Sequence, residues 1–291
     1  MRSVLLLCTE KDSSMKLHEA VYQRISTRTF QQKQLSKDDL KSINKILSTH
    51  EEMIGPFGHS FDFTFIMNDS NRINGNKIGT YGIIKNVPAY LVGVCDNNMP
   101  SIIDFGYIFE HIILELTTQE FGTCWLGGTF KRKDFNIELN DSEIIPAVSP
   151  IGYPASKRSF TEKIVRNVAK SDNRLAFNEL FFDVDFNSLN IEIGTDMIDC
   201  LSMVRKAPSA SNKQPWRIIV DQNNHVCHIY LARTKNYAKL LNYDIQALDI
   251  GIALAHLEIG LTHYKHNFER QTIDEHPTKD GWEYIISLTL K

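Results

Sequence analysis

Little in this sequence of 291 residues points to a cross-linked, membrane-spanning or nucleic-acid-binding protein. It has only five cysteines and no C-x-x-C pair, which is typical of a reduced protein rather than of a disulfide framework. It has no run of 18 apolar residues, so we expect no membrane span. Its 32 basic and 35 acidic residues nearly cancel, which leaves no basic surplus for a phosphate backbone and predicts no nucleic-acid partner. Glycine (15) and proline (9) are also few, which excludes a collagen-like or wholly disordered chain.

The first residues contain one short apolar run, Val4 to Cys8, which is soon followed by the charged residues Lys11 and Asp12. Five residues are too few for the core of a secretory signal. Helical periodicity begins only after Met15. We therefore expect residues 1–14 to be a peripheral extension and the protein to be cytoplasmic.

The remaining chain alternates between predicted helices and strands over a length of about two domains, at roughly 150 residues each. Two predicted helices, over 104–120 and 247–264, are apolar almost all round, which places them in a core or an interface rather than at a surface. Ser36, with acids in the next turn, predicts the start of a further helix, and another is expected over 197–206. The expected strands span 61–67, 89–95, 145–153, 216–220, 226–231 and 284–290. The polar stretch 155–190 is interpreted as a connecting arm.

The two apolar helices match at an offset of 145 residues. Asp104 aligns with Asp249 and Gly106 with Gly251, and three further identities follow in the same register: His111 with His256, Leu116 with Leu261 and Thr117 with Thr262. Because the surrounding elements also recur in the same order, the sequence predicts two related halves. The alternative, that two core helices merely share a composition, stays open.

Three clusters could carry chemistry. Arg24 and Arg28 are four residues apart with Ser26 between them, so two guanidinium groups could converge on one phosphate. The alternative for this cluster is a solvated surface. In the segment 122–130, Gly127 and Gly128 would let backbone N–H groups approach a flat ligand closely, although a helix end and turn is the alternative.

The third cluster, 207–216, places hydroxyl and amide side chains between two prolines. Such a loop could hydrogen-bond a heterocycle, or it could be a plain helix-to-strand turn. No metal site is expected, because His225, His228 and the helical set His256, His263 and His266 lack an acid–histidine motif. No protein nucleophile is assigned either, since Cys124 fits a small buried side chain better than a reactive thiol.

The segments 20–30, 122–128, 151–154 and 207–216, in this order, resemble the nitroreductase family of FMN-dependent oxidoreductases. The resemblance spans about residues 17–291 and is strongest to a subgroup in which one chain holds two degenerate halves. It implies an α+β fold of mixed antiparallel sheets flanked by helices, with the two halves forming an intramolecular pseudo-dimer. The first half is expected over 15–182 and the second over 183–291.

Each half retains one side of the family's site. The Pro-Ser loop that family members carry soon after the arginine motif is replaced here by Met53–His59, and it occurs instead in the second half. The second half in turn begins Asp199–Arg205 without the arginine motif and has no glycine pair after its apolar helix. The resemblance therefore implies one intact FMN site per chain.

Carried over residue by residue, the resemblance implies that Arg24 and Arg28 hold the FMN phosphate and that Ser26 binds phosphate or ribityl oxygens. Arg174 best matches a further basic residue of the family, with Lys157 and Arg158 as fallbacks. The residues implied to line the flavin from the first half are Tyr81, Gly82, Trp125, Leu126, Gly127 and Gly128. Those implied from the second half are Pro208, Ser209, Ala210 and Asn212.

The resemblance also implies an activity. NADH or NADPH would deliver a hydride to flavin N5, and the reduced flavin would pass electrons to a nitroaromatic, a quinone or a similar small molecule, with ping-pong kinetics. Other flavin chemistry, such as dehalogenation or flavin breakdown, and flavin binding without turnover remain alternatives. The chain is expected to act as a monomer (the pseudo-dimer) or a weak homodimer.

Overall fold

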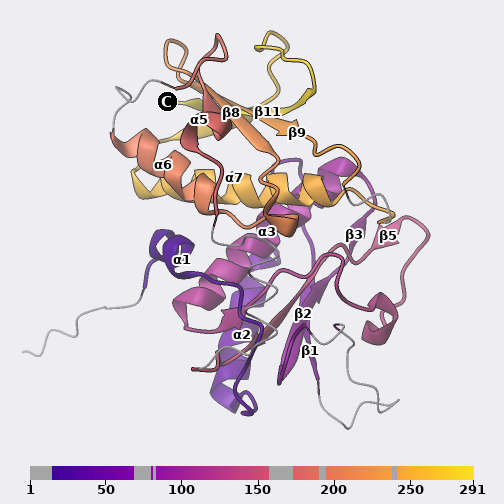
Figure 1. Cartoon of the computed structure of the whole chain (residues 1–291). Helices are drawn as coiled ribbons and strands as arrows, with labels where there is room; N and C mark the ends of the chain where they lie inside the picture. Colours follow the sequence, from indigo (N-terminus) through magenta and orange to yellow (C-terminus); the bar gives the residue numbers. More distant parts are fainter. Residues whose placement is uncertain (1–14, 69–79, 81–82, 157–172, 190–194, 238–240) are drawn as a thin grey trace, which may run out of the picture.

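The structure, a computed structural model of the whole chain, describes residues 15–68, 80, 83–156, 173–189, 195–237 and 241–291 (Figure 1). The expected N-terminal extension 1–14 and the candidate residues Tyr81, Gly82, Lys157 and Arg158 lie outside the described residues. Two antiparallel-rich sheets lie on either side of a central helix layer, so the predicted α+β fold with two halves is confirmed.

The first sheet has the strand order β1-β2-β6-β4, and all of its pairs are antiparallel. Its strands are β1 (Phe63–Met67), β2 (Ala89–Gly93), β6 (Val148–Gly152) and β4 (Gly122–Thr123). A small ribbon pairs β3 (Cys95–Asp96) with β5 (Glu143–Ile144). Every residue of β2 and β6 is buried, as befits the two middle strands of this sheet.

The second sheet has the order β10-β11-β9-β8-β7. Its strands are β7 (Phe181–Phe182), β8 (Trp216–Asp221), β9 (Val226–Ala232), β10 (Phe268–Gln271) and β11 (Trp282–Leu290). Only β7 is parallel to its neighbour, β8, among these pairs. The expected division after residue 182 therefore falls between two paired strands of one sheet. Phe181 is fully buried and contacts Phe177, a detail that the polar composition of 155–190 obscured.

One of the helices begins at the serine cap that the sequence predicts. The hydroxyl of Ser36 accepts a hydrogen bond from the Asp39 N–H and the Asp39 carboxylate accepts one from the Ser36 N–H, so the predicted helix start is confirmed. The α-helices within the described residues are α1 (Leu17–Gln23), α2 (Lys37–His50), α3 (Met99–Thr118), α5 (Phe177–Leu180), α6 (Thr195–Lys206) and α7 (Ile245–His263). The same part of the chain has two short 3₁₀ helices in loops, η1 (Arg132–Phe135) and η2 (Ala210–Asn212).

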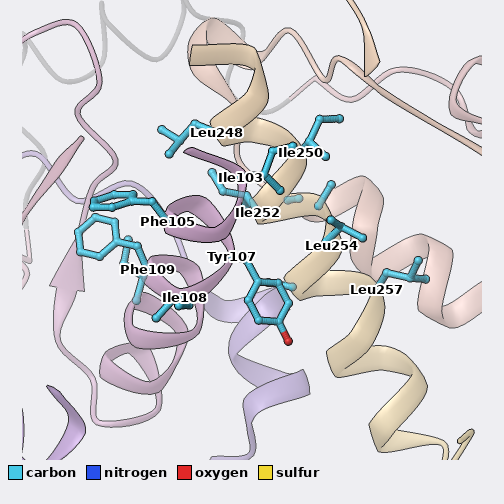
Figure 2. Close-up of a cluster of buried hydrophobic side chains, with 14 of the residues drawn as sticks. Ile103, Phe105, Tyr107, Ile108, Phe109, Leu248, Ile250, Ile252, Leu254 and Leu257 are labelled. Atoms are coloured by element: carbon cyan, nitrogen blue, oxygen red, sulfur yellow. The ribbon is translucent and has the colours of Figure 1, made fainter. Parts of the chain in front are cut away.

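Helices α3 and α7 form the seam between the halves, and Figure 2 shows their side chains meeting along it, among them Ile103, Tyr107 and Ile252. Residues 101–114 of α3 and 245–261 of α7 are all buried, so the prediction of two core helices is confirmed. By length and composition α7 could also cross a membrane, but 94% of its apolar window is buried inside the molecule.

The two helices cross at their aligned glycines. A Cβ atom on Gly106 would stand 2.3 Å from the carbonyl oxygen of Leu248, and one on Gly251 would stand 2.0 Å from that of Ile103. Ile103 and Leu248 are themselves 145 residues apart, so each half presents the same glycine to the same carbonyl of the other. The crossing is therefore a pseudo-two-fold contact, and it fixes how closely the two halves approach.

Candidate functional site

A cavity of about 550 Å³ lies between the two halves. Twelve of the fourteen site residues named from the sequence line it: Arg24, Ser26, Arg28, Trp125, Leu126, Gly127, Gly128, Arg174, Pro208, Ser209, Ala210 and Asn212. The other two, Tyr81 and Gly82, lie outside the described residues. Segments almost 200 residues apart in the sequence thus line one cavity, and its volume is that of an ordinary small-molecule site.

The arginine segment follows directly on α1. The helix ends when the N–H of Arg24 bonds to the Ala20 carbonyl, and the chain then runs beside β4, with the Thr27 N–H donating to the Thr123 carbonyl at 2.8 Å. This pairing holds Ser26 opposite Thr123 and so sets the guanidinium groups of Arg24 and Arg28 at the cavity wall.

These two arginines are short of partners. Nε and Nη1 of Arg24 and Nη1 of Arg28 are buried and make no hydrogen bond to any residue that the structure describes. The side chain of Arg24 is only 7% exposed, and its Nε lies 3.9 Å from a carboxyl oxygen of Glu110. Buried cationic N–H groups without acceptors are costly, and an anion in the cavity would remove this cost.

The glycine segment lines the cavity from the same half. Leu126 pairs with Val148 through two backbone hydrogen bonds, and the Gly127 carbonyl accepts from Arg132 at 2.9 Å and from the Tyr243 hydroxyl at 3.0 Å. A Cβ on Gly127 would stand 2.5 Å from Cδ1 of Ile245, the first residue of α7. Gly127 therefore lets this loop approach the other half closely. A plain helix end and turn would not need a glycine at this position.

The Pro-Ser loop supplies the opposite wall from the second half. Its tight shape rests on three left-handed residues, Ser211, Asn212 and Gln214, with φ values of 47°, 55° and 49°. The hydroxyl of Ser209 accepts from the Gln214 N–H at 2.9 Å, and one carboxyl oxygen of Asp249 accepts from the Ala210 N–H at 2.9 Å. The loop is thus held by Asp249 of α7.

Arg174 reaches the cavity from the connecting arm. One of its terminal nitrogens donates to the Asn212 side-chain oxygen at 2.8 Å and the other to the Lys206 carbonyl at 3.2 Å. The N–H of the next residue, Leu175, donates to the Gln214 side chain at 3.0 Å. These contacts tie Arg174 to the Pro-Ser loop, so the arm carries a third guanidinium group to the site.

Asp249 is the site residue whose role the sequence analysis missed. It lines the cavity at 2% exposure, and its second carboxyl oxygen makes no hydrogen bond within the described part of the chain. Burial raises the pKa of this carboxyl well above its usual value, and the nearby Asp244 adds to the rise. The sequence did contain a signal for Asp249, because it is one of the residues that recur at the offset of 145 residues.

The counterpart, Asp104, holds the loop that replaces the Pro-Ser loop in the first half. Its carboxylate accepts from the N–H groups of Phe57 and His59, at 2.8 and 3.0 Å, and from the His59 ring at 2.7 Å. A Cβ on Gly55 would overlap this carboxyl group. The two aspartates therefore support equivalent loops, but only the second-half loop faces the large cavity.

A comparison with known proteins gives the family. The family model described as "Putative TM nitroreductase" matches residues 16–261. The structure of a protein described as a putative nitroreductase from Thermotoga maritima aligns with 99% of this chain and 99% of its own, with 19% identity and a TM-score of 0.61. No curated protein matches the sequence.

Shorter structures align with about half of the chain. They include a nitroreductase with bound FMN from Bacteroides fragilis, with 19% identity, a TM-score of 0.37 and coverage of 50% of this chain and 92% of that one. A nitroreductase family protein from Clostridium difficile has 16% identity, a TM-score of 0.40 and coverage of 57% and 96%. From the match over residues 16–261 and the whole-length fold, the chain belongs to the putative TM nitroreductase family of oxidoreductases.

Proposed function

We propose that this protein is an FMN-dependent NAD(P)H oxidoreductase that reduces a nitroaromatic, a quinone or a similar small acceptor. The observation that carries the proposal is the pair of buried arginines, Arg24 and Arg28, whose unpartnered nitrogens line a cavity of about 550 Å³. An anionic group on the ligand would supply the missing acceptors. The phosphate of FMN is such a group, and family membership supports a redox cofactor.

The residues present fit this cofactor. Arg24 and Arg28 would bind the phosphate through charge-assisted hydrogen bonds, and Ser26 would donate to phosphate or ribityl oxygens. Arg174 would add a third cation from the side of the Pro-Ser loop. Trp125, Leu126 and the glycine pair would line the isoalloxazine ring on one side. Pro208, Ser209, Ala210 and Asn212 would do so on the other.

When bound, FMN would supply the redox chemistry, accepting a hydride from NADH or NADPH and giving two electrons to the acceptor. The chain's own contribution would be to bind and orient the FMN and to shield it from water. Backbone N–H groups of the glycine segment would offer donors to the ring, and the three arginines would stabilise negative charge at the site. Because the arginine and glycine segments occur only in the first half and the Pro-Ser loop only in the second, one chain would hold one FMN.

The test is flavin stoichiometry followed by reduction. The purified chain, loaded with FMN and freed from excess, should retain one FMN per polypeptide. Its visible absorbance should bleach under anaerobic conditions with NADH or NADPH and recover with a quinone or a nitroaromatic. Initial rates against both substrates should give the parallel double-reciprocal lines of ping-pong kinetics.

Three other results of these measurements would each contradict one part of the proposal. Two FMN per chain would contradict the single site. Retention of FMN without bleaching by either nicotinamide would indicate a flavin-binding protein without turnover. Failure to retain FMN at all would refute the cofactor assignment.

A further inference from the structure

A fully buried carboxylate, Glu110 of α3, lies behind the wall of the cavity. One of its oxygens accepts the indole N–H of Trp125 at 2.6 Å, and the other lies 2.8 Å from Nε2 of His256 on α7. The latter oxygen is also the one 3.9 Å from Nε of Arg24. Glu110 does not line the cavity, but two of its three partners, Arg24 and Trp125, do.

The hydrogen bonds around His256 define the charge of this group. Nδ1 lies 2.9 Å from the Met203 carbonyl, which can only accept, so Nδ1 carries a hydrogen. The 2.8 Å contact between Nε2 and the Glu110 oxygen needs a second hydrogen, on one atom or the other. The Glu110–His256 pair is therefore neutral as a whole, although its carboxyl group presents its oxygens to Arg24 and Trp125.

The two halves differ at this position. At the offset of 145 residues His256 corresponds to His111, but Glu110 corresponds to Ala255, which has no polar side chain. His111 is buried, and its Nε2 has no hydrogen-bond partner in the described segments. The half that carries the arginine and glycine segments is thus the half that carries the carboxylate.

We propose that Glu110 is the positioning residue of the cofactor cavity, which orients the phosphate-side Arg24 and the ring-side Trp125 through one carboxyl group. This inference rests on the proposed function, since it assigns those two side chains to the phosphate and the ring of FMN. Arg24 and Trp125 are about 100 residues apart in the sequence and lie on different segments of the first half. A single buried anchor fixes them relative to each other, and His256 and Met203 fix the anchor to the second half.

The first test is Glu110→Gln, measured by FMN titration. Glutamine can accept from Trp125 with its oxygen and donate to a neutral His256 with its nitrogen, so the hydrogen-bonded shape and the net charge of the pair are kept. What changes is the group that faces Arg24, where a carboxyl oxygen is replaced by an amide nitrogen that can only donate. We expect the FMN dissociation constant to rise about five-fold, in the range of coupling between side chains in contact.

Repeating Glu110→Gln in an Arg24→Ala background distinguishes an effect on the orientation of Arg24 from a general weakening of FMN binding. If Glu110 acts through Arg24, Glu110→Gln should change the dissociation constant less than about two-fold in that background. The same five-fold change in both backgrounds, or no change in the wild-type background, would overturn the inference.

The second test needs no flavin. Glu110→Leu removes the acceptor of the Trp125 indole N–H, so the tryptophan emission of the flavin-free protein should shift, and the shift should vanish in a Trp125→Phe background. An identical shift with and without Trp125 would show that the anchor does not hold this side chain. Because this readout is independent of FMN, it distinguishes failure of the anchor from failure of the proposed function.

Glu258→Gln is the matched control. Glu258 is also buried in a central helix, α7, and its two oxygens accept from Arg270 at 2.7 Å each, but it does not line the large cavity. The control should lower stability without changing the FMN dissociation constant. An equal loss of FMN affinity in both variants would mean that any buried carboxylate of the helix layer suffices, which would overturn the specific role of Glu110.

Discussion

Replacing Gly106 by alanine adds one methyl group at the point where α3 and α7 approach most closely. The new Cβ would stand 2.3 Å from the Leu248 carbonyl oxygen, which is 0.7 Å inside the 3.0 Å limit that real Cβ atoms keep. The obstacle is backbone within a helix rather than the end of a flexible side chain. The two helices would therefore have to separate, and the buried side chains along the crossing would lose contact.

The size of the effect follows from two opposed contributions. Overpacking a well-packed core costs about 1–3 kcal/mol, and occasionally more. Alanine returns up to about 1 kcal/mol through its better helix propensity. Since backbone meets backbone here, we expect the upper end of the first range and a net loss of roughly 2 kcal/mol for Gly106→Ala. Gly251→Ala should lose more, because its Cβ would stand 2.0 Å from the Ile103 oxygen and 2.7 Å from the Tyr107 nitrogen.

The assay is urea unfolding followed by circular dichroism, with the midpoint expected to fall at an unchanged slope. Ser48→Ala on the exposed side of α2 is the control and should stay within about 0.5 kcal/mol of the wild type. FMN affinity should fall with stability, because Ile245, Leu248 and Ile252 of α7 line the cavity. A Gly106→Ala variant as stable as the wild type would refute the close crossing.

Three further predictions concern single side chains. Arg24→Ala should weaken FMN binding by about 1.5–3 kcal/mol, as for loss of a hydrogen bond to a charged group, and an unchanged dissociation constant in a fluorescence titration would contradict the phosphate assignment. The pKa of Asp249 is raised in the folded state, so as the pH rises above about 4 the unfolded chain loses this proton first and the stability of the wild type falls. Asp249→Asn should therefore gain stability relative to the wild type from about pH 4 to 7, and a difference in stability that stays constant over this range would argue against the raised pKa. Burial lowers the pKa of His111 to about 3, so below about pH 6.5 the unfolded chain binds a proton that the folded chain does not, and acid destabilises the fold. His111→Leu should reduce this loss of stability, as measured by urea unfolding at each pH.

Much of this fold could be predicted because its largest elements have strong local signals. The two central helices are apolar on every face, and the start of α2 is encoded in Ser36 and Asp39. The weaker elements depend on distant partners. The edge strand β10 has the sequence Phe-Glu-Arg-Gln, which has no strand signal of its own, and it forms by pairing with β11. Strand β7 consists of two residues and forms by pairing with β8.

The candidate site divides in the same way. Arg24, Gly127 and Pro208 belong to clusters with recognisable spacing, and the structure brings them to one cavity. Glu110 and Asp249 are single acids in apolar helices, where no local pattern distinguishes an anchor from a tolerated polar residue. Their contacts come from other segments of the chain, Trp125 and His256 for Glu110 and Ala210 for Asp249. The repeat at the offset of 145 residues marks Asp249, but what each acid holds is shown only by the arrangement in space.

The structure also suggests why a symmetric crossing would serve only one ligand. Ile252 lines the large cavity, and its counterpart at the offset of 145 is Tyr107. The Tyr107 hydroxyl donates to Glu258 at 2.7 Å and accepts from Arg270 at 2.8 Å, and the Arg270 guanidinium lies 5.0 Å from the tyrosine ring. The small apolar side chain of Ile252 at the large cavity thus corresponds, at the symmetry-related position, to the larger ring of Tyr107 and its hydrogen bonds to the Glu258–Arg270 ion pair.

An ion pair of this kind resists a second ligand. Arg270 already donates to both oxygens of Glu258, so its charge is neutralised and it offers little to an incoming phosphate. Breaking the pair to admit one would leave the buried Glu258 carboxylate uncompensated, which typically costs about 3–5 kcal/mol. The arginines of the large cavity are in the opposite condition, since Arg24 and Arg28 keep buried nitrogens without hydrogen-bond partners among the described residues. The same backbone symmetry thus places arginines with buried nitrogens that lack hydrogen bonds on one side and a hydrogen-bonded ion pair on the other. This difference is the physical reason to expect one FMN per chain rather than two.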